Sequence, residues 1–172
     1  MNNDFITLAS SRFSVRKFSD KKVEQEKVDL ILNAGQVAPT ACNNQPQKIY
    51  VLQSEKALEK LNKCKYSRFG ETLAFIVCYD SSLCWKREFD GKTSGDIDAS
   101  IVATHMMLQA WELGIGSTWI MHFIPEAVSE EFNLPENVIP VSILVMGYPA
   151  ADAVPNVRHG IKKNPKDTVT FL

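Results

Sequence analysis

The sequence has few of the residues that build metal sites and disulfide frameworks. It contains four cysteines and three histidines in 172 residues, and no two cysteines have the CxxC spacing. A zinc site therefore has no scaffold in this pattern. The opening residues MNNDFITLAS are too polar for a secretion signal, so we expect a cytoplasmic protein with reduced cysteines. Cys78, inside an apolar run, is expected to be a buried apolar side chain.

Strong net charge and long apolar runs are also absent. The formal net charge is −1, which argues against a general nucleic-acid-binding protein. No apolar run is long enough to span a bilayer. The nucleotide-binding patterns GxGxxG and GxxxxGK[ST] and the hydrolase pattern GxSxG do not occur. The length and the 45% hydrophobic content suit a single domain over residues 1–172.

The apolar pattern predicts a mixture of helices and strands. Helices do not alternate regularly with strands, which favours an α+β fold over a doubly wound one. Asn3 or Asp4 is the expected N-cap of the first helix. We expect helices at 3–12, 20–40, 54–64, 96–113 and 125–135, strands at 47–54, 72–80 and 138–149, a short extended segment at 117–123, and a loop at 80–95.

The helix at 96–113 is the most informative element. Between Asp98 and Glu112 it carries no charged residue other than His105 if that is protonated. A helix that is apolar all round is expected to be buried on all sides. A small domain can rarely surround a helix, so we expect a dimer interface here. His105 is then a core histidine, and Asp96 and Asp98 are first-turn carboxylates of the helix rather than a metal pair.

Residues 11–18, SRFSVRKF, form a basic segment. In an extended chain Arg12, Ser14 and Arg16 would share one face, and the other face would carry Phe13, Val15 and Lys17. Two guanidinium groups and a hydroxyl can hold a phosphate through charge-assisted hydrogen bonds. The same spacing also fits a solvated face that leads into a helix.

Two further stretches are rich in turn residues and polar side chains. Residues 38–47, APTACNNQPQ, which we call the amide loop, concentrate Asn and Gln side chains between Pro39 and Pro46. Such a loop can read the edge of a heteroaromatic ring, or it can be a plain helix-to-strand connection. Gly114 and Gly116 allow close approach of backbone or ligand, or a helix end followed by a core strand.

Taken in order, these stretches resemble the nitroreductase family of FMN-dependent oxidoreductases over nearly the whole chain. The family pattern R-x-S-x-R-x-F is matched at 12–18 and P-[ST]-A-x-N-x-Q-P at 39–46. A GLG-like turn with a short strand is matched at 114–122, and G-Y-P followed by lysines is matched from 147 onward.

The resemblance implies a nitroreductase-like fold, with a central, mainly antiparallel sheet flanked by helices. It also implies an intertwined homodimer in which FMN lies at the interface and residues 167–172 cross to the partner. By this resemblance, Arg12, Ser14 and a late lysine bind the phosphate. Arg16 lies near the pyrimidine edge of the flavin, and backbone groups near His122 face the reactive part of the ring. The full set of FMN-binding residues is Arg12, Ser14, Arg16, Pro39, Thr40, Ala41, Asn43, Gln45, Ile120, Met121, His122 and either Lys162 or Lys163, the amide-loop members coming from the partner.

The implied activity is transfer of a hydride from NADH or NADPH through flavin N5 to a nitroaromatic, a quinone or a similar small acceptor. The flavin carries the chemistry, so no catalytic side chain and no metal is expected. Other flavin chemistry, such as reductive dehalogenation or flavin fragmentation, and FMN binding without turnover remain alternatives. The short interval between Asp80 and Asp96 leaves little lid, so we expect a substrate pocket that is open or built by the partner.

Overall fold

The protein is organised around a four-stranded antiparallel sheet. A computed structural model describes residues 4–172, and its strands lie in the order β1-β2-β4-β3. β1 is Gln47–Leu52, β2 is Leu73–Asp80, β3 is Gly116–Ile120 and β4 is Val138–Gly147, and all neighbours run antiparallel. β2 is a central strand, as its apolar sequence predicts.

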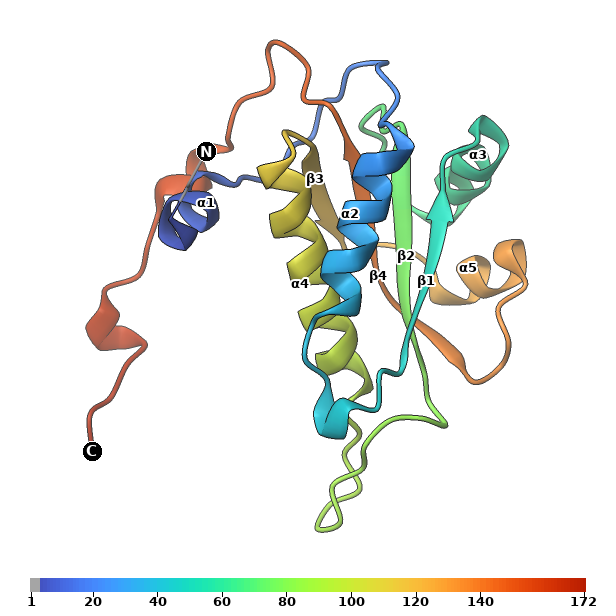
Figure 1. The fold of residues 1–172 in the computed structure, drawn as a ribbon, viewed down its shortest axis with the longest axis vertical. Helices are drawn as coiled ribbons and strands as arrows, with labels where there is room; N and C mark the ends of the chain where they lie inside the picture. The colour runs from blue at the N-terminus through green and yellow to red at the C-terminus, as the bar shows by residue number, and fades with distance from the viewer. Residues whose placement is uncertain (1–3) are drawn as a thin grey trace.

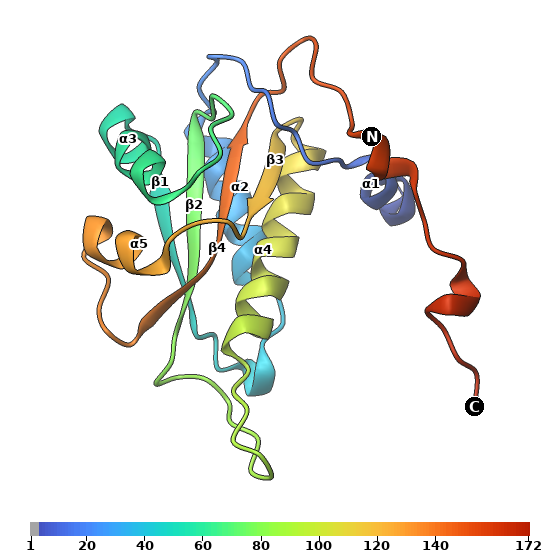
Figure 2. The same ribbon diagram turned by 180° about the vertical axis from the view of Figure 1, so that it is seen from behind.

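Helices cover both faces of the sheet. α2 (Gln25–Gln36) and α4 (Gly95–Glu112) lie on one face, and α3 (Glu55–Cys64) and α5 (Pro125–Phe132) lie on the other (Figure 1). The view from behind shows the same layers (Figure 2). Alternate β2 side chains serve the two cores: Leu73, Phe75 and Val77 pack with α2 and α4, and Ala74, Ile76 and Cys78 pack with α3 and α5. The predicted α+β class is confirmed.

The helix ends follow local sequence signals. α1 (Phe5–Ser11) is capped by Asp4, whose carboxylate accepts a hydrogen bond from the Ile6 amide at 3.1 Å. Asn3, the alternative cap, lies outside the described residues. Pro125 occupies the first turn of α5, and Gly114 ends α4 with a φ of +75°.

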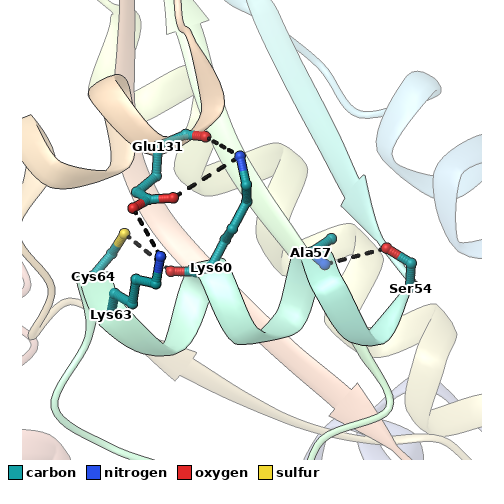
Figure 3. Close-up of polar contacts among 6 residues, drawn as sticks. All are labelled: Ser54, Ala57, Lys60, Lys63, Cys64 and Glu131. Atoms are coloured by element: carbon teal, nitrogen blue, oxygen red, sulfur yellow. Dashed lines mark hydrogen bonds and ion pairs between the residues drawn. The ribbon is translucent and has the colours of Figure 1, made fainter.

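α3 and α5 are joined across the second face by ion pairs (Figure 3). Lys60 Nζ donates to the Glu131 carbonyl at 3.0 Å, and Lys63 Nζ lies 3.3 Å from Glu131 Oε1. Ser54 caps α3 by accepting a hydrogen bond from the Ala57 amide at 3.2 Å. These contacts are partly solvated, so we expect the apolar face of α3 to contribute more to stability than the charges do.

Buried Cys78 behaves as predicted. Its side chain is inaccessible to solvent, and burial raises the pKa of its thiol to about 12. All four cysteines are free, with Cys42 exposed and Cys64 buried. Within residues 4–172, no helix has the length and apolar character needed to cross a membrane.

Two segments extend from the body. Residues 81–94 form a twisted hairpin loop at the end of the molecule where α4 begins (Figure 1). The loop expected here therefore has internal pairing, with a bridge between Lys86 and Thr93. At the other end of α4, the C-terminal tail runs away from the body and contains the short 3-10 helices η2 (Val157–Gly160) and η3 (Pro165–Asp167). Residues 167–172 form no strand within this chain.

Candidate functional site

The basic segment lies in extended conformation beside β3. The Val15 amide donates to the Ser117 carbonyl at 2.9 Å, and the Thr118 hydroxyl donates to the Val15 carbonyl. Val15 is fully buried, as the alternation predicts. A Cβ atom on Gly116 would lie 2.6 Å from Val15 Cγ2, so only glycine lets the segment dock this closely.

Arg12, Ser14 and Arg16 line one cavity of about 310 Å³, as expected for side chains on a shared face, but Phe13, which was expected on the opposite face, lines it as well. Phe13 and three tail residues, Asn156, Arg158 and His159, complete its lining. The cavity thus gathers three guanidinium groups and an imidazole without a carboxylate. Between residues 4 and 172, none of these arginines has an ion-pair partner. Such a set of donors fits a phosphate-sized anion.

Arg158 and His159 were missed by the sequence reasoning, which looked to Lys162 and Lys163. Both lysines lie just beyond η2, are exposed and do not line the cavity. The Phe13 ring connects the two parts of the lining, because its centroid lies 6.3 Å from that of His159. Phe13 is itself held edge-on against Trp111 of α4 at 5.2 Å. The sequence does contain one signal that could have identified Arg158, since it is the first cationic residue after the G-Y-P motif.

The amide loop has an unusual backbone. Cys42, Asn43 and Gln45 have φ values of +52°, +54° and +49°, a region that side-chain-bearing residues seldom adopt. Within the loop, Thr40 Oγ1 accepts a hydrogen bond from the Gln45 amide at 3.0 Å, and Gln45 Nε2 donates to Asn43 Oδ1 at 3.2 Å. A strained loop with exposed amides is typical of a ligand-contacting segment.

A buried carboxylate fixes the amide loop to α4. Asp98 is 1% exposed, and its Oδ1 accepts a hydrogen bond from the Ala41 amide at 2.9 Å. Its Oδ2 accepts a hydrogen bond from the Ser94 hydroxyl at 2.7 Å. Asp98 and Asp96 both lie in the first turn of α4, as expected, but only Asp96 is exposed, whereas Asp98 is buried and binds the amide loop.

Within one chain the amide loop and the basic segment lie apart. The loop contacts Asp98 near the start of α4, whereas Ser11 accepts a hydrogen bond from Trp111 Nε1 near its end at 2.9 Å. About 20 Å of helix separates Asp98 from Trp111 at the usual rise of 1.5 Å per residue. Figure 1 shows η1 (Ala41–Asn43) and the basic segment at opposite ends of the sheet. A single chain thus does not unite the predicted site residues.

The segment after β3 is divided between core and surface. Ile120 is buried, whereas Met121 and His122 are exposed. The His122 ring stacks on Tyr66 with a centroid distance of 4.4 Å and an interplanar angle of 23°. Sequence reasoning did not identify Tyr66, because its only signal was a lone aromatic in a loop.

The loop that carries Tyr66 is fixed by a buried ion pair. Lys65 Nζ lies 2.6 Å from Glu71 Oε1, and the two side chains are 0% and 3% exposed. Lys65 Nζ also donates to Asn62 Oδ1 at 2.8 Å and to the Ser67 carbonyl. These hydrogen bonds compensate the desolvation of the ammonium group, so they hold Tyr66 in place against His122.

α4 is covered on one side only. Its buried side includes Val102, Ala103 and Met106, but Ile97 is 52% exposed. The prediction of burial on all sides is therefore wrong for the single chain, because α2 and the sheet reach only one face of the helix. The uncovered face, which we call the open face, carries a shallow cavity of about 450 Å³ lined by Asp96, Ile97, Ser100, Ile101, Thr104 and His105. His105 lies on this face rather than in the core, with Nδ1 3.0 Å from the Ile101 carbonyl.

Comparisons with known proteins agree with the fold and with the resemblance found in the sequence. The family model described as "Nitroreductase family" matches residues 9–74 and 63–148. A nitroreductase family protein of Clostridium difficile 630 has a similar structure, with a TM-score of 0.93, 41% identity and coverage of 98% of each chain. A Methanothermobacter thermautotrophicus protein, provisionally named NADH dehydrogenase/NAD(P)H nitroreductase, is 31% identical over 86% of this chain and 78% of its own length. A protein named FMN-dependent nitroreductase from Clostridium difficile R20291 has a TM-score of 0.72 and 27% identity, with coverage of 93% and 99%.

Proposed function

The chain belongs to the nitroreductase family of oxidoreductases, and from this membership we propose that it binds FMN and passes electrons from NADH or NADPH to a small acceptor such as a nitroaromatic or a quinone. The observation that carries the proposal is the cavity of three arginines beside β3. Its donors carry the charge that a phosphomonoester requires, and its lining holds no competing carboxylate.

The residues present fit FMN. Arg12 and Ser14 would hold the phosphate. Arg158 and His159 line the same cavity and would donate further hydrogen bonds to the phosphate. Arg16, at the exposed side of that cavity, would lie nearer the pyrimidine edge of the ring. A cation there stabilises the negative charge that a reduced flavin carries. Lys162 and Lys163 would supplement the phosphate contacts through movement of the tail.

A homodimer would complete the site. The amide loop lies about 20 Å from the basic segment of its own chain, so Pro39, Thr40, Ala41 and Asn43 would serve the flavin of the partner, with Gln45 close by. The open face of α4 is apolar and uncovered, and the tail carries exposed Val157, Ile161 and Phe171. Both features support a two-fold interface with a site at each end.

The protein's own contribution would be to bind and orient. Bound FMN would supply the two-electron chemistry, with N5 as the hydride acceptor and donor. Backbone groups of Ile120, Met121 and His122 would face the reactive part of the ring, and the His122 side chain stacks on Tyr66. Overall, NAD(P)H, a proton and a quinone would give NAD(P)⁺ and the hydroquinone. We assign no side chain as acid or base.

The deciding experiment is anaerobic absorption spectroscopy of the FMN-reconstituted protein. We expect flavin bands that NADH or NADPH bleaches and that a quinone or nitroarene restores. Bands that persist after both donors are added would refute the reductase and favour a binding protein. A protein that retains no FMN would refute the whole site. Turnover with nitroarenes, quinones and halogenated phenols then separates the acceptor classes.

A further inference from the structure

Few contacts hold the C-terminal tail to the body of the protein. Of residues 154–172, all of which the structure describes, His159 alone is partly buried. The hydrogen bonds of these residues join positions two to four apart, and none reaches the rest of the described chain, residues 4–153. Figures 1 and 2 show η2 beside α1 and the remainder of the tail running away from the sheet. The position of the tail therefore depends on the contacts of η2.

η2 meets the body at the cavity of three arginines. The His159 ring lies edge-on to the Phe13 ring, with centroids 6.3 Å apart and an interplanar angle of 65°. Arg158 lines the cavity from the tail, and Arg12 and Arg16 line it from the basic segment. Two segments that are more than 130 residues apart in the sequence thus form the two sides of one anion site.

Both sides of this cavity carry cations. Guanidinium groups of Arg12 and Arg16 on one side and of Arg158 on the other repel one another through the partly solvated space between them. A phosphate between the two sides replaces this repulsion by charge-assisted hydrogen bonds to both. The anion is therefore a bridge, and without one the charges work against docking of the tail.

The carboxylates of the neighbouring segments do not supply this bridge. None lines the cavity among residues 4–172, and Asp167 of the tail lies in η3, beyond the lining. The others have partners of their own, which are Lys17 for Asp152, the Ile6 amide for Asp4 and the Gln109 side chain for Glu112.

We propose that the phosphate of the bound flavin fixes the tail to the body and thereby positions the tail for packing on a second copy of the chain. The phosphate would accept hydrogen bonds from Arg12 and Ser14 on one side and from Arg158 on the other. A flavin that lacks the phosphate would leave the two cationic sides unbridged. The inference rests on the proposed function, because it takes FMN as the ligand of this cavity.

The link to pairing follows from the side chains that the tail carries. Ile161, Val169 and Phe171 are exposed on the single chain, and such side chains gain stability by packing on another surface. A tail already fixed by the phosphate loses less conformational entropy when it packs on the second copy. FMN binding and pairing should then strengthen each other by the same factor.

Hydrogen–deuterium exchange of the amides in residues 156–161, followed by mass spectrometry, tests the fixing of the tail. The comparison is between saturating FMN and saturating riboflavin, which has the same ring without the phosphate, at equal protein concentration. FMN should slow exchange about 10- to 100-fold relative to riboflavin, the range for one charged hydrogen bond. Inorganic phosphate should likewise slow exchange of the flavin-free chain relative to chloride at the same ionic strength.

The double variant Arg158→Gln, His159→Gln should lose most of the difference between FMN and riboflavin. Lys166→Gln is the matched control, because Lys166 is a cation of the same tail outside the cavity lining, and it should keep the difference. Equal exchange with FMN and riboflavin in the wild type would overturn the proposal. An undiminished difference in the double variant, or an equal loss in Lys166→Gln, would do the same.

Sedimentation velocity over a dilution series tests the link to pairing. FMN should lower the dissociation constant of the pair about tenfold relative to riboflavin in the wild type and in Lys166→Gln, but not in the double variant. Because both flavins carry the ring, the comparison isolates the phosphate from contacts of the ring with the partner. Equal constants with FMN and riboflavin in the wild type would overturn this link.

The proposed function and this inference fail in different ways. If neither NADH nor NADPH bleaches the flavin, the reductase is refuted, while slower exchange with FMN or inorganic phosphate would still support the fixing of the tail. If the flavin is bleached but exchange is the same with FMN and riboflavin, the reductase stands and the inference is refuted.

Discussion

Replacing Asp98 by alanine should loosen the amide loop and destabilise the protein. The carboxylate is buried, and it accepts hydrogen bonds from the Ala41 amide and the Ser94 hydroxyl. Its removal leaves the part-buried Ala41 amide and the buried Ser94 hydroxyl without this acceptor. It also removes the side-chain hydrogen bond that joins the Ala41 amide to α4, so the strained backbone from Cys42 onward loses this support.

The magnitude follows from these two hydrogen bonds. A hydrogen bond to a charged group contributes about 1.5–3 kcal/mol to the free energy of unfolding. Removing the carboxylate also removes the cost of its desolvation, which offsets part of the loss of two such bonds. We therefore expect Asp98→Ala to lower the free energy of unfolding by about 3 kcal/mol. For a chain of this length such a loss lowers Tm by about 6–12 °C. Asp98→Asn keeps one acceptor oxygen and should recover about half of the loss.

Thermal unfolding followed by circular dichroism, with and without FMN, measures this effect. Asp96→Ala is the control, since Asp96 is an exposed carboxylate in the same turn of α4 and should change stability by no more than about 0.5 kcal/mol. Equal Tm values for Asp98→Ala and Asp96→Ala would refute the reasoning. FMN affinity should fall in Asp98→Ala and be largely restored in Asp98→Asn, which a purely global loss of stability would not produce at a temperature where all variants are folded.

Three other variants test the map of the site and the surface charges. Arg12→Ala should weaken FMN binding about 10- to 100-fold in a fluorescence titration, which is the range for one charged hydrogen bond. Lys17→Ala, on the opposite side of the segment, should leave FMN binding unchanged. Equal FMN affinities for the two variants would contradict the assignment of Arg12 to the phosphate. Arg16→Ala should make bound FMN harder to reduce, and an unchanged reduction potential would count against its place at the pyrimidine edge. The hydrogen bond from Tyr148 lowers the pKa of Glu24 from 4.5 to about 2, so the unfolded chain binds the proton more tightly. The stability that ionised Glu24 contributes is present above pH 4.5 and is lost as the pH falls toward 2. The urea midpoint of unfolding should therefore change less with pH over this range in Tyr148→Phe than in the wild type. An identical change with pH in both proteins would show that the Tyr148–Glu24 pair has no role.

The elements of the fold could be predicted because their signals are local. Alternation identified the extended basic segment, and the run from Leu73 to Cys78, apolar at every position, identified a central strand. The motif order then pointed to the family and to a cavity in which Arg12, Ser14 and Arg16 do meet. These features depend on the period of side chains along a helix or strand, which the sequence displays directly.

Contacts between distant segments could not be predicted in this way. The hydrogen bond from Ala41 to Asp98 joins residues 57 positions apart, and neither residue type indicates its partner. Arg158 reaches the basic segment only because the chain after β4 turns back along residues 17–19. The hairpin at 81–94 has the composition of an ordinary loop, and its pairing depends on the turn at Gly91. A family sequence pattern predicts contacts between distant segments only where those contacts are already known for the family.

The protruding tail would link assembly of the protein to its lifetime if it packs on a second copy. Residues 150–172 hold four cationic side chains, Arg158, Lys162, Lys163 and Lys166, on exposed backbone that a trypsin-like protease can enter. If the tail packs on a second copy as proposed, those peptide bonds are protected only in the pair. A chain newly released from the ribosome, or one diluted away from its partner, would then be trimmed first. Degradation would then remove unpaired copies and leave the paired enzyme.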